Sequence, residues 1–173
     1  MTKEQFMELI AQEQESLRRF LCGLCSGDGF RADDLAQEAL LKAYLSFERF
    51  EGRSKFTTWL FRIAFNCWYD SQKRAGKESE WLSLEDRPPG ESPADMAESE
   101  IDRSHEYQQL HQAIGNLPLQ EQTVILLFYM EEKSVKEIEM ITGMPSGTVR
   151  SHLSRGRRHL KEYLDTLWRQ NRT

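Results

Sequence analysis

Apolar side chains recur every three or four residues along much of the chain, which is the spacing of one buried face of an α-helix. In the N-terminal part this pattern predicts a long first helix that ends where residues 27–29, Gly-Asp-Gly, interrupt it. A second helix is expected to begin near Ala32, with Asp33 and Asp34 in its first turn, where the helix dipole favours carboxylates. A third helix is expected over residues 57–74.

Helical periodicity returns in the C-terminal part of the chain. Two helices are expected between residues 106 and 130, and Pro118 suits the first turn of the second one. A short helix over residues 135–141 should end at Gly143, and a longer final helix should follow with Ser146 as its N-cap. Because no stretch alternates apolar and polar residues as a strand would, we expect an all-α protein.

A change of composition separates these two parts. Residues 75–104 contain three prolines, two glycines, nine acidic and three basic side chains, and few apolar ones, which is typical of a solvated linker. We therefore predict two small helical domains, residues 1–75 and 106–173, joined by a flexible acidic linker over residues 76–105.

The charge of the last helix suggests its partner. The whole chain has a net charge of −5, but residues 145–173 carry seven basic and two acidic side chains. A short helix, a glycine turn and a basic helix predict a helix-turn-helix whose final helix enters the major groove of DNA. Its apolar stripe comprises Val149, Leu153, Gly156, Leu160 and Leu164. The alternative is that the arginines only solvate a terminal helix.

The third helix and the residues before it are rich in aromatic and basic side chains. Arg62, Asn66, Tyr69 and Lys73 fall on one side of the helix, a surface that could stack unpaired bases and hold their backbone. The alternative is that the aromatic residues form the core, which we favour for Phe56, Trp59 and Phe61 and leave open for Phe65 and Tyr69.

Three cysteines allow an enzymatic alternative. Cys22 and Cys25 form a Cys-x-x-Cys pair, but no second pair or nearby histidines would complete a zinc site. Both lie in an apolar helical pattern, so we expect small buried side chains and no metal, cofactor, catalytic residue or small-molecule substrate. An odd cysteine count, and the absence of a secretory or membrane-spanning segment, favour the cytoplasm.

Three stretches together resemble one protein family. They read RADDLAQEALLKAY (31–44), FEGRSKFTTWLFRIAFN (50–66) and SVKEIEMITGMPSGTVRSHLSRGRRHL (134–160). In this order, with a linker between the second and third, they resemble the extracytoplasmic-function (ECF) group of bacterial RNA polymerase sigma factors. The resemblance implies promoter recognition, promoter melting and transcription initiation, with core polymerase and promoter DNA as partners and an anti-sigma factor that in this family is often membrane-bound.

The resemblance also implies roles for individual residues. Contacts with the polymerase clamp helices are expected from Asp34, Gln37, Glu38 and Leu41. Contacts with the minus-10 element are expected from Phe50, Arg53, Lys55, Arg62, Asn66, Tyr69, Lys73 and Arg74. Contacts with the minus-35 element are expected from Ser134, Thr148, Arg150, Ser151, Ser154, Arg155, Arg157 and Arg158. A further polymerase contact, with the flap, is expected of the C-terminal domain.

Three positions depart from the family pattern. Phe65 and His152 stand where arginine is common, and Gly156 stands where alanine is common. We expect the first to weaken contact with a single strand, and the glycine to cost up to about 1 kcal/mol of helix propensity. A stand-alone helix-turn-helix regulator remains the rival interpretation; unlike a sigma factor, it would bind DNA without polymerase.

Overall fold

The computed structural model describes residues 1–76 and 105–172, and the regular elements in these ranges are all helical. This confirms the predicted all-α class. The predicted acidic linker, 76–105, lies outside the described residues except at its two ends.

Three helices form the N-terminal bundle: α1 (Lys3–Leu24), α2 (Gly29–Ser46) and α3 (Phe56–Arg74), with a short 3-10 turn, η1 (Phe47–Arg49), after α2. α1 starts with a capping box in which the side chains of Thr2 and Gln5 each bind the other's backbone N–H. α2 starts three residues earlier than predicted. The reason is that Asp28, which the sequence placed in an interruption, is the N-cap and accepts the N–H of Arg31.

The C-terminal bundle holds α5 (His105–Gly115), α6 (Leu119–Ile125), a π-helical turn η2 (Leu126–Met130), α7 (Val135–Thr142) and α8 (Ser146–Asn171). The predicted N-cap of α8 was wrong by one residue. Pro145 occupies the cap position, and the Ser146 hydroxyl instead donates a hydrogen bond to the Glu139 carboxylate on α7. Pro118 is likewise the N-cap of α6 rather than a residue of its first turn.

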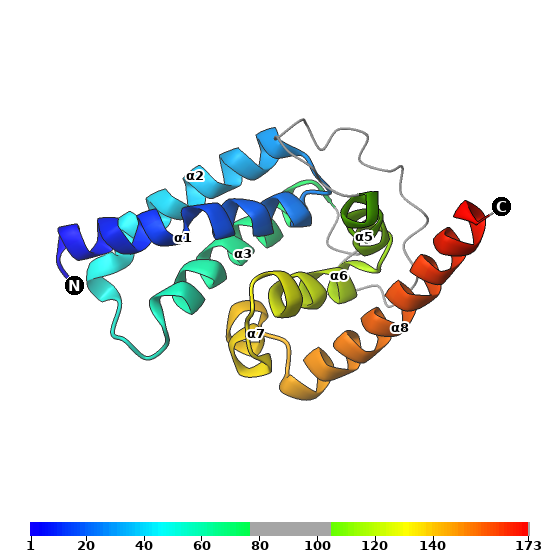
Figure 1. The fold of residues 1–173 in the computed structure, drawn as a ribbon. Helices are drawn as coiled ribbons and strands as arrows, with labels where there is room; N and C mark the ends of the chain where they lie inside the picture. The colour runs from blue at the N-terminus through cyan, green and yellow to red at the C-terminus, as the bar shows by residue number, and fades with distance from the viewer. Residues whose placement is uncertain (77–104, 173) are drawn as a thin grey trace.

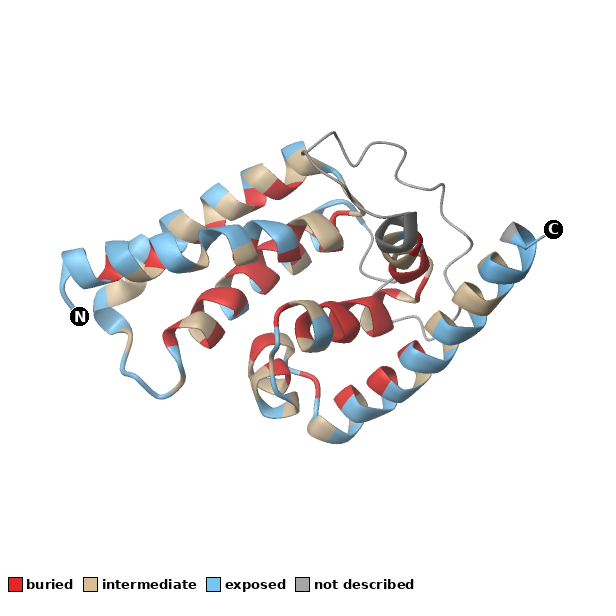
Figure 2. Cartoon of the chain, viewed as in Figure 1, coloured by how far each residue is buried: buried red, intermediate tan, exposed pale blue. Residues whose placement is uncertain are grey.

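Within each bundle the helices bury one face and expose the other (Figures 1 and 2). α1, α2 and α3 pack on one another, and a hydrogen bond of 2.8 Å from Arg31 on α2 to Ser71 on α3 joins two of them. α6 packs along α8, which also contacts α5 and α7. Cys25 and Cys67 are buried and Cys22 is half-buried, so they serve as small apolar side chains.

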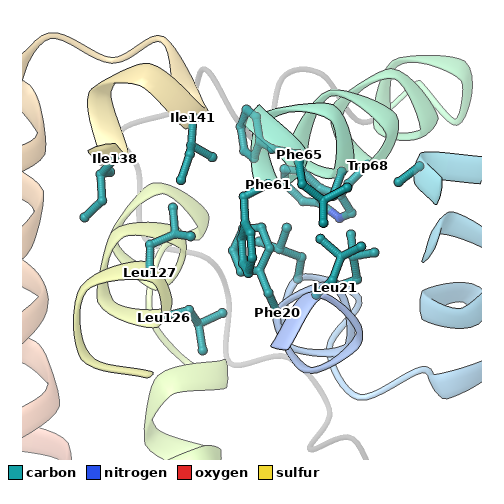
Figure 3. Close-up of a cluster of buried hydrophobic side chains, with 14 of the residues drawn as sticks. Phe20, Leu21, Phe61, Phe65, Trp68, Leu126, Leu127, Ile138 and Ile141 are labelled. Carbon is teal, nitrogen blue, oxygen red and sulfur yellow. The ribbon is translucent and has the colours of Figure 1, made fainter. Parts of the chain in front are cut away.

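The two bundles also pack against each other. α3 lies against α7, and α1 touches η2. Figure 3 shows Phe20, Phe61 and Phe65 of the N-terminal bundle facing Leu127 and Ile141 of the C-terminal bundle in a common apolar cluster. The sequence had predicted two bodies without their relative placement; the structure joins them through one core.

Candidate nucleic-acid interface

The predicted helix-turn-helix is formed by α7 and α8. Ser134 is the N-cap of α7, where its hydroxyl accepts the N–H of Glu137 at 3.1 Å. α7 ends at Gly143, whose φ of 78° lies in the left-handed region that glycine adopts without strain. The hydrogen bond of 3.0 Å from Ser146 to Glu139 then ties the first turn of α8 to α7. These short-range contacts fix the angle at which α8 leaves the turn.

α8 separates an apolar face from a cationic face. Val149 and Leu153 are buried against the preceding helices, as predicted, while Leu160 and Leu164 are half-buried farther along. The predicted DNA-binding side chains on the opposite side are mostly exposed: Arg150, Ser151, Ser154, Arg157 and Arg158, with Thr148 and Arg155 half-buried. The structure therefore gathers seven of the eight predicted minus-35 residues on one helix, with Ser134 exposed at the start of α7.

Arg155 is held by its own helix. Its Nε lies 3.4 Å from the Ser151 carbonyl oxygen, and its Nη2 lies 3.5 Å from Nδ1 of His152. His152 is buried on the other side of α8, so this departure from the family pattern acts on the packing of the helix rather than on the exposed surface that carries the predicted DNA-binding residues. Burial, assisted by the charge of Arg155, lowers the pKa of His152, which favours the neutral ring.

A pair that the sequence did not indicate, with one buried member, anchors the middle of α8. Nδ1 of His159 lies 2.7 Å from Oε2 of Glu121 on α6, and the Glu121 side chain is only 6% exposed. Beside it Gly156 allows a close approach, because a Cβ there would lie 2.9 Å from Cγ1 of Ile125. The glycine predicted to cost helix propensity is thus the position at which α8 meets α6.

The exposed face of α2 carries the predicted polymerase-binding residues. Asp34 and Gln37 are exposed, Leu41 is 59% exposed, and Glu38 pairs with Lys42 at 3.1 Å. The same side of α2 also presents two large apolar residues that sequence reasoning missed, Phe30 (89% exposed) and Leu45 (73% exposed). Their helical spacing from Leu41 was the signal that could have identified them.

The predicted minus-10 surface lies on α3 and the loop before it. Arg62 and Asn66 are exposed, and Tyr69 is half-buried with Nζ of Lys73 5.0 Å from its ring centroid. Arg74 is also exposed, 4.0 Å from the Glu38 carboxylate. Phe65, left open in the sequence, is buried at 3% exposure.

The loop residues make contacts of their own. Phe50 is half-buried, with its ring centroid 5.2 Å from that of Trp59. Arg53 pairs with the neighbouring Glu51 at 2.8 Å, and Lys55 reaches Glu137 of α7 at 3.6 Å. Phe56 and Phe61 are buried and Trp59 is half-buried, so the preferred core interpretation of these rings is confirmed for the first two.

An apolar groove of about 420 Å³ runs along α8 on the C-terminal bundle. Its walls come from α5, the α6–η2 segment and α8, and include Leu110, Ile114, Ile125, Tyr129, Leu160, Leu164 and Trp168. Tyr129 and Trp168 are about half exposed at its edge. The groove was not predicted, because its lining is assembled from three helices.

Neither a metal site nor a membrane span is found in the part of the chain that the structure describes. Residues 1–76 and 105–172 contain no cluster of three or more histidine, cysteine or acidic side chains placed to hold a metal ion. None of their helices is long and apolar enough to cross a membrane. Burial raises the pKa of the Cys25 thiol to about 11, which makes it a poor nucleophile at neutral pH.

The N-terminal bundle has an exposed polar face, and the C-terminal bundle contains a helix-turn-helix whose second helix is cationic. Together they define a helical DNA-binding protein of two bundles. Comparison with known families agrees in both halves: residues 9–78 match Sigma-70 region 2, and residues 107–160 match Sigma-70, region 4. The chain belongs to the ECF group of RNA polymerase sigma factors, and its function is that of a sigma factor in transcription initiation.

Similar proteins cover most of the chain. The ECF sigma factor SigW of Bacillus subtilis is 35% identical over 158 residues, which cover 85% of this chain and 82% of SigW. The ECF sigma-E factor of Haemophilus influenzae is 30% identical, covering 95% of this chain and 90% of that protein. Among solved structures, the sigma factor RpoE in complex with the anti-sigma factor NepR from Bartonella quintana superposes with a TM-score of 0.72 at 26% identity, covering 94% of this chain and 98% of that chain.

Proposed function

We propose that the chain divides promoter recognition between two domains joined by an acidic linker. Residues 1–75 act as sigma region 2, which binds polymerase and the minus-10 element, and residues 106–173 act as region 4, which binds the minus-35 element, with residues 76–105 between them. The observation that carries this proposal is the two-sided α8, whose buried Val149 and Leu153 fix an exposed row of arginines in a helix-turn-helix.

In region 4, Arg150, Ser151 and Ser154 lie in the first turns of α8 and read base edges in the major groove. Arg157 and Arg158 lie farther along and bind phosphates, while Ser134 and Thr148 contribute from the start of α7 and α8. Arg155 joins the readers by exchanging its contacts with Ser151 and His152 for contacts with DNA. The support for these roles is the exposure of the row and its position in the helix-turn-helix.

In region 2, the opened strand of the minus-10 element lies on α3. Arg62, Asn66 and Tyr69 form the adjoining surface, and Lys73 and Arg74 supply cations for the strand's backbone. Phe50, Arg53 and Lys55 belong to the loop that takes up a base flipped out of the strand. An aromatic and polar pocket offsets the few kcal/mol that unstacking a base costs.

Polymerase binds two separate surfaces on this proposal. The clamp helices dock on α2 at Asp34, Gln37, Glu38 and Leu41, which share one exposed face. The flap docks in the apolar groove along α8, whose half-exposed Trp168 and Tyr129 offer a surface for an apolar helix. Two surfaces on different bundles let one polymerase hold both ends of the chain.

The chain works by recognition and is not an enzyme; the polymerase supplies the chemistry. It acts in the cytoplasm, where bacterial core polymerase is found, with no cofactor and no small-molecule substrate. An anti-sigma factor, membrane-bound in many relatives, holds it until a signal releases it. The support for such a partner is the likeness to a sigma factor solved with its anti-sigma factor.

Transcription from a library of random promoters by purified core polymerase tests the proposal. Adding the chain should yield transcripts from sites that share two elements, and omitting it should yield none of them. Gel shifts with and without core polymerase separate the rival interpretation, because a stand-alone regulator would shift DNA by itself. A chain that starts no transcript with core polymerase, or binds its site equally well without it, contradicts the proposal.

A further inference from the structure

One face of α8 carries two histidines and a glycine where the helix packs along α6 (Figure 1). His152, Gly156 and His159 are spaced four and three residues apart, so they share one side of the helix. Arg150, nine residues before His159, lies about 180° around the axis from it at 3.6 residues per turn. The face that meets α6 is therefore the back of the surface that carries the predicted DNA-binding residues.

Glu121 of α6 is the charged group that meets this face. Its side chain is only 6% exposed, and its Oε2 accepts a hydrogen bond of 2.7 Å from Nδ1 of His159. Its charge also acts on the ring of His152, which is buried on the same face. A carboxylate withdrawn from water is costly unless a donor compensates it. The Glu121–His159 pair therefore holds α6 and α8 together at one fixed point.

Gly156 is the residue that lets α6 come so close. A Cβ at this position would lie 2.9 Å from Cγ1 and 3.2 Å from Cδ1 of Ile125, and 3.5 Å from Cβ of Glu121. Alanine, which is common here in the family, would therefore push α8 away from α6. The chain has a residue of poor helix propensity within a helix of 26 residues, and this residue permits the contact with Glu121.

The polar pair fixes what the apolar contacts of α8 leave free. Val149 and Leu153 hold the helix by burying apolar area, and such a contact has no preferred direction. A hydrogen bond depends on angle as well as on distance. Arg150 lies about 14 Å along the axis from His159, so a tilt of about 4° at the pair would move Arg150 by about 1 Å. Binding groups must be held within about 0.5 Å of their productive geometry.

We propose that Glu121 is a positioning residue for the reading helix: with His159 it sets the tilt and rotation of α8 in the major groove, and so determines which minus-35 bases the chain accepts. This inference rests on the proposed function of α8. Glu121 itself touches no DNA and acts through His159 and Gly156. Loss of the pair should reduce discrimination between minus-35 sequences more than affinity for DNA in general, because phosphate contacts carry no sequence information.

Substitutions of His159 separate its hydrogen bond from its bulk. His159→Leu fills much of the same space without a donor. His159→Asn keeps a donor, because Nδ2 of asparagine is bonded to Cγ as the ring Nδ1 is. Glu162→Gln is the matched control, since Glu162 is an exposed carboxylate on the same helix. Circular dichroism verifies that each variant keeps its helices.

Binding of the reconstituted holoenzyme to a promoter and to single-base variants of its minus-35 element measures the discrimination. His159→Leu should lower the ratio of affinities for the best and the substituted elements about fivefold, the low end of what one base contact contributes. His159→Asn and Glu162→Gln should keep the ratio. A merely structural pair would instead lower the folded fraction and weaken binding to every element by the same factor. An unchanged ratio in His159→Leu, or a ratio that His159→Asn fails to restore, overturns the proposal.

Gly156→Ala tests the same contact from the other side. Alanine has the higher helix propensity, so the substitution favours the helix itself. Its Cβ meets Ile125 and should shift α8, and discrimination should fall about as far as in His159→Leu. A loss of discrimination in this variant cannot come from a weaker helix. Discrimination equal to that of the unaltered chain overturns the proposal that this contact sets the position of α8.

Residual dipolar couplings measured by NMR give the orientation of α8 relative to α6 in the free, full chain, without polymerase or DNA. The orientation should change in His159→Leu and Gly156→Ala and stay the same in His159→Asn. An unchanged orientation in the first two variants overturns the positioning role. If the orientation changes as expected while holoenzyme with the unaltered chain shows no minus-35 preference, the proposed function of α8 is refuted and the positioning of the helix by Glu121 stands.

Discussion

Replacing Arg150 by alanine is the sharpest test of the proposal that α8 reads DNA. The helix rises about 1.5 Å per residue, and a major groove is about 12 Å wide, so about eight residues of α8 fit within it. Arg150 lies in the second turn of α8 and is exposed, whereas its neighbour Val149 is buried. Lys161 lies on the same face but eleven residues later, about 16 Å along the axis and therefore outside the groove.

These distances predict different losses of DNA affinity for substitutions on the same face of α8. If Arg150 makes a bidentate base contact, Arg150→Ala should cost about 1 to 3 kcal/mol, or about 5- to 150-fold in affinity for the minus-35 element. Arg158→Ala should weaken binding to all sequences alike and lower the slope of log affinity against log salt by about 0.9, because one phosphate contact is lost. Lys161→Ala should change neither quantity.

The assay is binding of the reconstituted holoenzyme to a promoter and to single-base variants of its minus-35 element, at several salt concentrations. Arg150→Ala should lose discrimination at one base position and keep its helical circular dichroism. Equal discrimination by Arg150→Ala and the unaltered chain would refute base reading by Arg150. An effect of Lys161→Ala as large as that of Arg150→Ala would refute the depth of insertion on which the ranking depends.

Three other changes test the remaining features. The Gln37→Ala, Glu38→Ala double variant should lose core polymerase binding in a pull-down and keep its melting temperature. The matched control, Gln14→Ala, Glu15→Ala on the exposed face of α1, should bind normally. Retained affinity in the first variant would move the docking site away from α2. Because burial lowers the pKa of His152, the unfolded chain takes up a proton first as the pH falls through about 6.5, so the stability from this residue is full above that pH and decreases below it. The free energy of unfolding of His152→Gln, measured by urea titration, should therefore decrease less between pH 7.5 and 5.5 than that of the unaltered chain. Parallel curves for the two chains would contradict this source of acid sensitivity. The Cys22→Ser, Cys25→Ser variant should support promoter-directed transcription at the level of the unaltered chain in a run-off assay. Its stability should decrease at most slightly, through the buried Cys25. Loss of transcription in a variant that remains folded would support a redox or metal role.

The helices could be predicted from the sequence because each buries one face, and a face leaves a period of three to four residues. The two faces of α8 follow directly from this, as does the exposed side of α2 around Leu41. Errors at helix starts have a local cause. Asp28 is the N-cap of α2, whereas the sequence suggested an interruption there. Pro145 is the N-cap of α8, whereas the sequence placed the cap at Ser146.

Contacts between distant residues left no comparable pattern. Glu121 lies between two glutamines in the sequence, and only the fold brings it within 2.7 Å of His159. The same holds for Arg19 and Glu131, which are 112 positions apart. Phe65 was ambiguous because an aromatic side chain on a helix can stack with a base or fill a core, and the choice depends on the placement of α7. The groove along α8 was hidden for the same reason.

The Arg19–Glu131 pair limits how freely the halves of this chain can be recombined. A chimera that joined its C-terminal bundle to the N-terminal bundle of a relative lacking a cation at the position of Arg19 would leave the nearly inaccessible Glu131 carboxylate without its partner. Such a hybrid would have to separate its halves so that water could solvate that carboxylate. Domain exchange among these factors should therefore succeed most readily when both members of the pair travel together.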